Sequence, residues 1–151
     1  MAFPQLNLPI ADLKIKLVKG TTQVFDVVRK KYFQLTDEEW VRQNFLHYLN
    51  SEKKYPFGLM GVEKMIKYNN KRTRADIVLY NKDGSPRVIV ECKAPHVEIT
   101  QDTFNQIARY NFMLRVDFLI LTNGMKYYCC KMDYENNTSS YVKEVPHFQR
   151  I

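Results

Sequence analysis

The stretch RVIVECK, residues 87–93, decides the fold that we predict for this chain. Its apolar run VIV, at 88–90, is typical of a central β-strand that is buried on both faces. Side chains alternate along a strand, so Glu91 and Lys93 should project to one face and Cys92 to the other. Burying unpaired charge is unfavourable, so the carboxylate and the amine need a reason to be there. They form an ion pair or serve a common substrate.

The preceding strand has the same unusual feature, because Asp76 stands at the beginning of the apolar run IVLY, residues 77–80. The segment NKDG, residues 81–84, is typical of a turn and predicts an antiparallel hairpin. Pairing around the middle of this turn sets residue i opposite about residue 166 − i, which places Asp76 opposite Val90 and within one or two positions of Glu91. Two carboxylates this close favour a hard cation such as Mg²⁺.

The rest of the chain predicts an α/β fold. Thr36 and Glu39 have the spacing of a capping box at the start of a first helix, and Thr100 can cap a second helix. Strands are expected at 13–17, 24–27, 62–68, 75–80, 87–94, 117–122 and 126–133, and helices at 37–50 and 101–114. Strands interrupted by helices argue for a mixed central sheet flanked by helices on both faces, with an N-terminal β-hairpin extension.

The 151 residues suit a single domain. We divide it into an N-terminal extension (1–35), a core (36–133) and an irregular C-terminal tail (134–151). No apolar run approaches the roughly 20 residues that span a bilayer. Three cysteines, two of them adjacent, make a poor disulfide framework, so a reducing cytoplasm is expected.

The net charge of +7 is unevenly distributed. Residues 1–75 hold 14 Lys and Arg against 7 Asp and Glu, whereas residues 76–151 hold nine of each. A one-sided positive field suits a polyanionic partner such as DNA, although a basic protein with solvated lysines remains an alternative. The basic run that leads into Asp76 is the candidate phosphate-binding segment. It comprises Lys64, Lys67, Lys71, Arg72 and Arg74.

Asp76 followed by Glu91-Cys92-Lys93 resembles the D…E-x-K pattern of the PD-(D/E)xK nuclease superfamily, with Ala75 in place of the usual proline. The surrounding sequence resembles the N-terminal nuclease domain of type I restriction enzyme R proteins over roughly residues 36–133. The matching stretches are WVRQ (40–43), RADIVLY (74–80), IVECKAP (89–95), QIARY (106–110) and LTNG (121–124).

This resemblance implies a restriction-endonuclease-like fold and a Mg²⁺-dependent DNA endonuclease, in which Mn²⁺ can substitute. By the same resemblance, Asp76 and Glu91 are metal ligands, together with the backbone carbonyl of Cys92, and Lys93 is the catalytic amine. Gln106 and Tyr110 fall on an accompanying Q-x-x-x-Y motif and are placed with the catalytic residues. Glu39 aligns with a first-helix acid that completes the metal site in some members, an alternative to its capping role.

The resemblance also implies partners: DNA, and either restriction-modification subunits or a second copy of the chain. No G-x-x-x-x-G-K-[ST] loop is present, so the sequence predicts neither an ATP site nor a motor. Two other interpretations of the cluster stay open. It is a structural charge group, or the fold is a catalytically inactive module for DNA binding or subunit docking.

Overall fold

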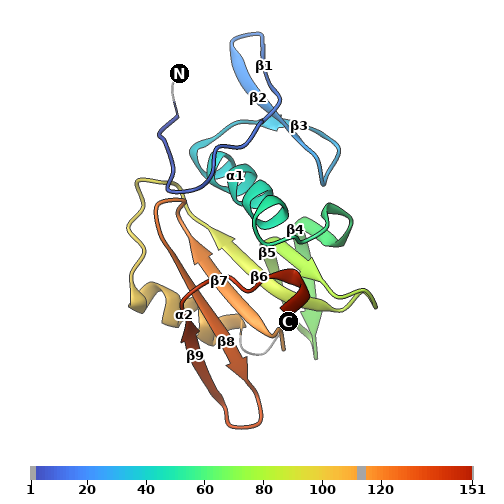
Figure 1. The fold of residues 1–151 in the computed structure, drawn as a ribbon, viewed down its shortest axis with the longest axis vertical. Coiled ribbons are helices and arrows are strands. Elements are labelled where there is room, and N and C mark those ends of the chain that lie inside the picture. The colour runs from blue at the N-terminus through green and yellow to red at the C-terminus, as the bar shows by residue number, and fades with distance from the viewer. Residues whose placement is uncertain (1–2, 112–114, 151) are drawn as a thin grey trace.

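The computed structural model describes residues 3–111 and 115–150 and contains two β-sheets and two main helices (Figure 1). The larger sheet has six strands in the order β4-β5-β6-β7-β8-β9. Its strands are β4 (Met60–Tyr68), β5 (Lys71–Tyr80), β6 (Pro86–Cys92), β7 (Phe118–Thr122), β8 (Tyr127–Asp133) and β9 (Thr138–Val142). β6 and β7 pair in parallel and every other neighbouring pair is antiparallel. The predicted mixed sheet is confirmed.

Helix α1 (Asp37–Ser51) packs on one face of this sheet, and α2 (Gln101–Asn111) packs on the other. Val41, Phe45 and Leu49 of α1 share a core with Val88 and Val90 of β6. On the opposite face, Phe104 of α2 shares a core with Ile89 and Leu119. The strand β6 is therefore buried on both faces, as its apolar run predicts. By alternation along β6, Glu91 points away from the face that Val90 and Cys92 bury.

Thr36 caps α1, because its hydroxyl oxygen accepts the backbone N–H of Glu39 at 3.1 Å. The carboxylate of Glu39 is engaged elsewhere, by Arg29, Arg42 and Gln43. Thus the threonine half of the predicted capping box is confirmed, and the glutamate belongs to a tertiary network. The predicted end of the second helix, 112–114, lies outside the described residues.

The N-terminal extension is a three-stranded antiparallel sheet rather than the predicted hairpin. Its strands are β1 (Ile15–Val18), β2 (Thr21–Asp26) and β3 (Lys31–Gln34). The third strand was missed because it has only four residues and no alternating apolar pattern. It is defined by backbone pairing with β2, in which Phe25 lies opposite Tyr32.

The expectation of an irregular tail is wrong for residues 138–142, which form β9 at the edge of the main sheet. The segment TSSYV is polar and almost wholly exposed, so no hydrophobic pattern marks it as a strand. Backbone hydrogen bonds to β8 define it instead. Two short 3-10 turns complete the described chain, η1 (Phe57–Leu59) and η3 (Phe148–Arg150). None of the described helices is long and apolar enough to cross a membrane.

Candidate functional site

A β-bulge brings Asp76 opposite Glu91. Next to the turn, Tyr80 pairs with Pro86, which is the register that the turn alone predicts. Between Leu79 and Tyr80 the register shifts by one residue, and from there Leu79 pairs with Val88 and Ile77 with Val90. Continued by one position, this register sets Asp76 across from Glu91. Bulges commonly re-aim side chains in this way next to functional sites.

The carboxylate of Asp76 is held on both oxygens. Oδ2 accepts the backbone N–H of Cys92 at 2.7 Å, and Oδ1 accepts Nη2 of Arg42 at 2.9 Å. The pairing of β5 with β6 ends at Ile77 and Val90, while Cys92 continues to pair with β7. The side chain of Asp76 therefore takes over as a partner of β6 where the two strands cease to pair. A charged acceptor on a backbone N–H makes a strong, orienting hydrogen bond.

Glu91 shares this site with Asp76, and its pKa is raised to about 8. Burial is the largest cause, followed by the negative charge of Asp76 and a hydrogen bond to that carboxyl group. The positive charge of Lys93 acts in the opposite direction. At neutral pH the proton on Glu91 therefore relieves repulsion between two carboxylates, a task that a bound cation can also perform.

Lys93 is half-buried just past the end of β6. Its backbone N–H donates to the carbonyl oxygen of Thr122 at 2.8 Å, which anchors its position to β7. The positive charge of Lys93 acts to lower the pKa of Glu91 and of Glu38. The pKa of Glu38 is raised all the same, first by burial and then by the negative charge of Asp76. Asp76 and Lys93 thus act on the charge of Glu91 in opposite directions. The assignment of these three residues to a catalytic site stays a prediction.

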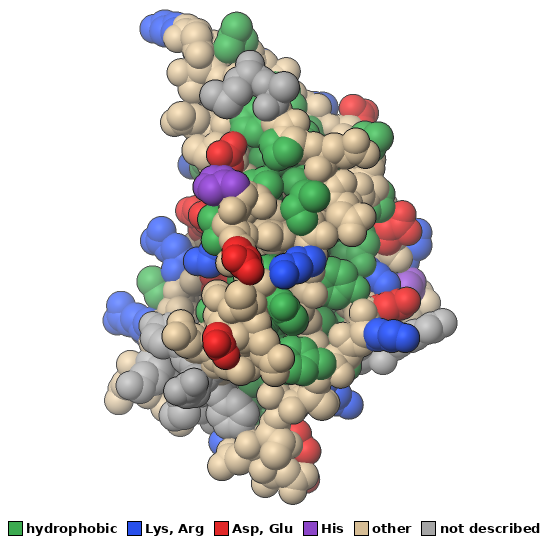
Figure 2. All heavy atoms as spheres, turned by 90° about the vertical axis from the view of Figure 1, so that its left-hand side faces the viewer, with side chains coloured by type: hydrophobic (Ala, Val, Ile, Leu, Met, Phe, Trp, Pro, Cys, Tyr) green, Lys and Arg blue, Asp and Glu red, His purple; other side chains and the backbone are tan. Residues whose placement is uncertain are grey.

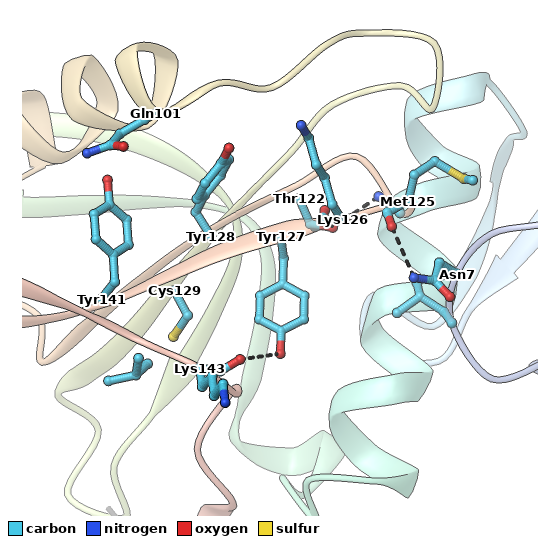
Figure 3. A pocket seen from close by; sticks show the side chains of 13 residues that line it. Asn7, Gln101, Thr122, Met125, Lys126, Tyr127, Tyr128, Cys129, Tyr141 and Lys143 are labelled. Atoms are coloured by element: carbon cyan, nitrogen blue, oxygen red, sulfur yellow. Dashed lines mark hydrogen bonds between the residues drawn. The ribbon is translucent and has the colours of Figure 1, made fainter.

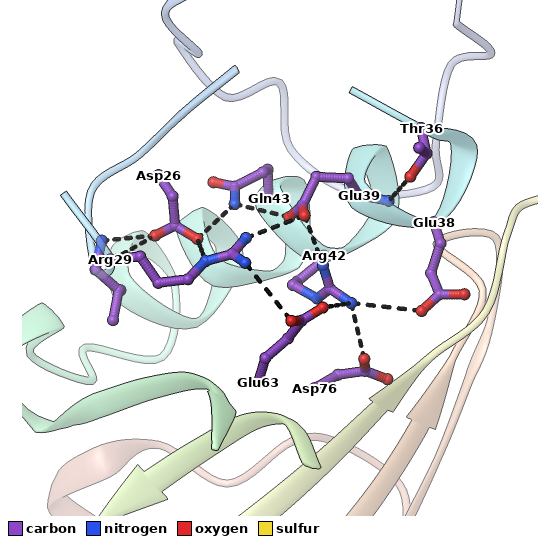
Figure 4. A network of polar contacts seen from close by, with 10 residues as sticks. Asp26, Arg29, Thr36, Glu38, Glu39, Arg42, Gln43, Glu63 and Asp76 are labelled. Carbon is purple, nitrogen blue, oxygen red and sulfur yellow. Dashed lines mark hydrogen bonds and ion pairs between the residues drawn. The ribbon is translucent and has the colours of Figure 1, made fainter. Parts of the chain in front are cut away.

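A network of arginines and acids joins this site to the N-terminal sheet (Figure 4). Arg42 Nη1 contacts Glu39 Oε1 at 2.6 Å, and Nη2 contacts Asp76 and, at 3.4 Å each, Glu38 and Glu63. Arg29 binds the same Glu39 oxygen at 3.0 Å. The acids around Arg42 raise its pKa, so this buried guanidinium stays charged.

Arg42 and Glu63 were not predicted as site residues. For Arg42, the signal available in the sequence was its spacing, because acids three and four residues earlier, Glu39 and Glu38, share its helical face. Glu63 has no comparable signal. It adopts a left-handed backbone conformation, with φ of 53°, where β4 departs from regular pairing with β5. A non-glycine residue in this region stores strain and is commonly found at functional sites.

The donors at this site fit a hard divalent cation of the kind that keeps several waters. Asp76 and Glu91 supply carboxylate oxygens, and Mg²⁺ is usually bound by one or two carboxylates plus substrate phosphates. Across residues 3–111 and 115–150, no group of three or more His, Cys, Asp or Glu side chains is arranged as a ready metal cage. Arg42 contacts both Glu39 and Asp76, so in this structure its guanidinium lies between the two acids. The thiol of Cys92 is buried, which raises its pKa well above the ordinary value, so only its backbone carbonyl suits a hard cation.

The predicted Q-x-x-x-Y residues lie on α2. Gln106 is exposed, on the side of the helix away from the buried Phe104. The side chain of Tyr110 lies outside the described part of the chain. The assignment of these two residues to the catalytic group stays a prediction.

The basic run forms part of a long β4–β5 hairpin. Lys64, Lys67, Arg72 and Arg74 are exposed, and the side chain of Lys71 lies outside the described residues. Lys67 is directly opposite Arg72 in the pairing. Like charges across a strand pair are destabilising on their own, and a polyanion would relieve this repulsion.

A separate hollow of about 550 Å³ lies beyond β7 (Figure 3). Tyr127, Tyr128 and Tyr141 line it, together with Lys126 and Lys143, and none of the described residues that line it is an acid. Through β7, Tyr128 pairs with Leu121, which pairs with Glu91. Tyr128 is therefore two strands away from Glu91, and neither Asp76 nor Glu91 lines the hollow.

The fold and this arrangement of two carboxylates and a lysine on adjacent strands define a restriction-endonuclease-like domain. Residues 37–146 match the family described as type I restriction enzyme R protein N terminus. The chain belongs to that family.

Two solved structures are similar to the chain. One is a fragment assigned to an HsdR subunit of a type I restriction enzyme from Vibrio vulnificus YJ016, with 19% identity and a TM-score of 0.51 over 77% of this chain and 25% of that one. The other is a protein assigned as a nuclease from Anabaena variabilis ATCC 29413, with 12% identity and a TM-score of 0.48 over 91% of this chain and 80% of that one. The chain thus spans about a quarter of the Vibrio fragment, and that likeness shows a shared fold. No curated protein matches the sequence.

Proposed function

We propose that the domain hydrolyses DNA phosphodiester bonds with the help of Mg²⁺, for which Mn²⁺ can substitute. The observation that carries this proposal is the pairing of Asp76 with Glu91, whose pKa of about 8 reflects burial and the adjacent carboxylate. Asp76, Glu91 and the carbonyl of Cys92 would hold the ion. When bound, such an ion polarises a phosphate and lowers the pKa of a bound water.

The protein residues supply orientation and charge. The backbone N–H of Cys92 and the guanidinium of Arg42 fix the carboxylate of Asp76 from two sides. Lys93 projects to the same face as Glu91 and places a positive charge beside the attacked phosphate. A positioned charge of this kind stabilises the transition state more than the bound substrate, and its loss typically lowers a rate by about 10²- to 10³-fold.

A second candidate function is a DNA-binding or subunit-docking module without catalysis. One observation favours it, because Arg42 contacts Asp76 at 2.9 Å and supplies part of the positive charge that an ion would bring. The two candidates differ in a simple respect. A nuclease takes up Mn²⁺ at Asp76 and Glu91 and cleaves, whereas a module need only bind DNA.

The test is a cleavage assay on plasmid and linear DNA, with Mg²⁺ and with EDTA. We expect cleavage only with Mg²⁺, and its loss in Lys93→Ala. Lys82→Ala is the matched control, because Lys82 is an exposed lysine in the β5–β6 turn, at the far end of those strands. DNA that stays intact under every metal condition, while binding remains measurable, would favour the module.

A further inference from the structure

The N-terminal sheet precedes the residues that match the family, which begin at 37. Residues 14–34 contain five lysines and one arginine but a single acid, Asp26. That acid is fully buried and is bound by Arg29 at 2.7 Å. The outer surface of this sheet is therefore positively charged, which suits a polyanion.

One face of the sheet combines these charges with aromatic rings. The Nζ of Lys16 lies 3.8 Å from the ring centroid of Tyr32, and the Nζ of Lys14 lies 5.6 Å from that of Phe25. The two rings meet edge to face, with centroids 5.3 Å apart at 64°. Cation–π contacts hold the amines over the rings. These ring faces are then shared with amines, so this surface offers charge and not an open platform for stacked bases.

The sheet is joined to the candidate site by short contacts. Arg29, which follows β2, binds Glu39 at 3.0 Å; Arg42 binds Glu39 at 2.6 Å and Asp76 at 2.9 Å. Two arginines and one acid thus separate the base of the sheet from Asp76. The sheet extends from there to the top of the molecule, where the β1–β2 turn lies (Figure 1). In the space-filling view, a basic side chain lies at this upper tip, next to hydrophobic and other side chains (Figure 2).

We propose that the face carrying Lys14, Lys16, Phe25 and Tyr32 binds the phosphate backbone of duplex DNA that flanks the cleavage position. This inference rests on the proposed function, because it identifies where the same DNA substrate continues beyond Asp76. Contacts between amines and phosphates carry no sequence information, so the face sets affinity and orientation, not sequence preference.

The test measures binding of the full chain to a long DNA duplex in EDTA. Fluorescence anisotropy reports the affinity at each of a series of salt concentrations. The variant Lys14→Gln/Lys16→Gln should weaken binding and reduce the slope of log affinity against log salt by up to about 2, since each phosphate contact contributes about 0.9. The variant Lys14→Arg/Lys16→Arg, which keeps both charges, should retain the slope. Circular dichroism checks that each variant is folded.

The matched control is Lys82→Gln/Lys131→Gln, which removes the same charge from two exposed lysines. Lys131 pairs with Phe118, which pairs with Val88, so it lies at the opposite end of the sheet from Glu91. Equal salt slopes for this control and the Lys14/Lys16 variant overturn the proposal. A second result would also overturn it. If the Lys14/Lys16 variant keeps its DNA affinity but sediments differently, then the face is a contact between copies of the chain.

Cleavage with Mg²⁺ is measured on the same proteins, so the two proposals fail separately. A chain that binds duplex through this face without cutting it removes the proposed function and keeps this inference. If the chain cleaves DNA but its DNA affinity does not depend on Lys14 and Lys16, then the proposed function is kept and this inference fails.

Discussion

Replacing Arg42 by alanine should destabilise the domain strongly. The Arg42 side chain is 5% exposed, and it contacts four carboxylates. Those of Glu38 and Glu63 are 49% and 40% exposed, so water screens most of their interaction with Arg42. Those of Glu39 and Asp76 are 7% and 15% exposed. Glu39 would keep Arg29 as a partner, whereas Asp76 would lose the guanidinium that lies 2.9 Å away.

Removing one partner from a buried ion pair typically costs about 3–5 kcal/mol, because the charge left behind is uncompensated. For a domain of this length, that corresponds to a fall in Tm of roughly 6–20 °C. Differential scanning calorimetry and urea denaturation in EDTA measure both quantities. The double variant Arg42→Met/Glu39→Gln should recover part of the loss, since both members of the closest pair then become neutral.

Lys53→Ala is the control for this prediction. Lys53 forms an ion pair with Glu144 at 3.8 Å, but Glu144 is 80% exposed, so little stability should be lost. If Arg42→Ala is destabilised no more than Lys53→Ala, then the network seen in Figure 4 contributes little and the reasoning is wrong.

Four further predictions concern the site and its partner. Asp76→Ala should abolish Mn²⁺ binding in calorimetric titration because a ligand is lost, and wild-type affinity in this variant would refute the metal assignment. Lys93→Ala should bind DNA and Mn²⁺ normally but cleave about 10²- to 10³-fold more slowly in single-turnover assays; a loss that merely follows unfolding in a thermal melt would contradict a catalytic role. Neutralising Arg72 and Arg74 together should lower the salt slope of duplex binding by up to about 2, equally for unrelated sequences. The pKa of Glu91 is raised from 4.5 to about 8 in the folded state. Between these two pH values the folded chain therefore binds more protons than the unfolded chain, so its stability should fall as the pH rises through this window. Urea midpoints measured at several pH values in EDTA should show this fall in the wild type and not in Glu91→Gln.

Local pattern was sufficient to predict the centre of the fold. The apolar run at 88–90 predicted a strand buried on both faces, and Asp76 and Glu91 were predicted to lie within one or two positions of each other. Such inferences succeed because alternation and turn chemistry act over a few residues. The third strand of the N-terminal sheet and β9 could not be found in this way. These short strands are defined by backbone pairing with neighbours that the local sequence does not reveal.

Only the tertiary structure decided the environment of the site. The turn predicted one register, and the bulge after Leu79 changed it by one residue, which set Asp76 across from Glu91. The role of Arg42 also depends on packing, because 34 residues separate it from Asp76 in sequence. Charge and strand order can be read along the chain, but burial and the approach of distant side chains set the pKa of Glu91 and the guanidinium contact on Asp76. The sequence by itself therefore determined which residues carry the candidate chemistry, and the fold decided how they are held.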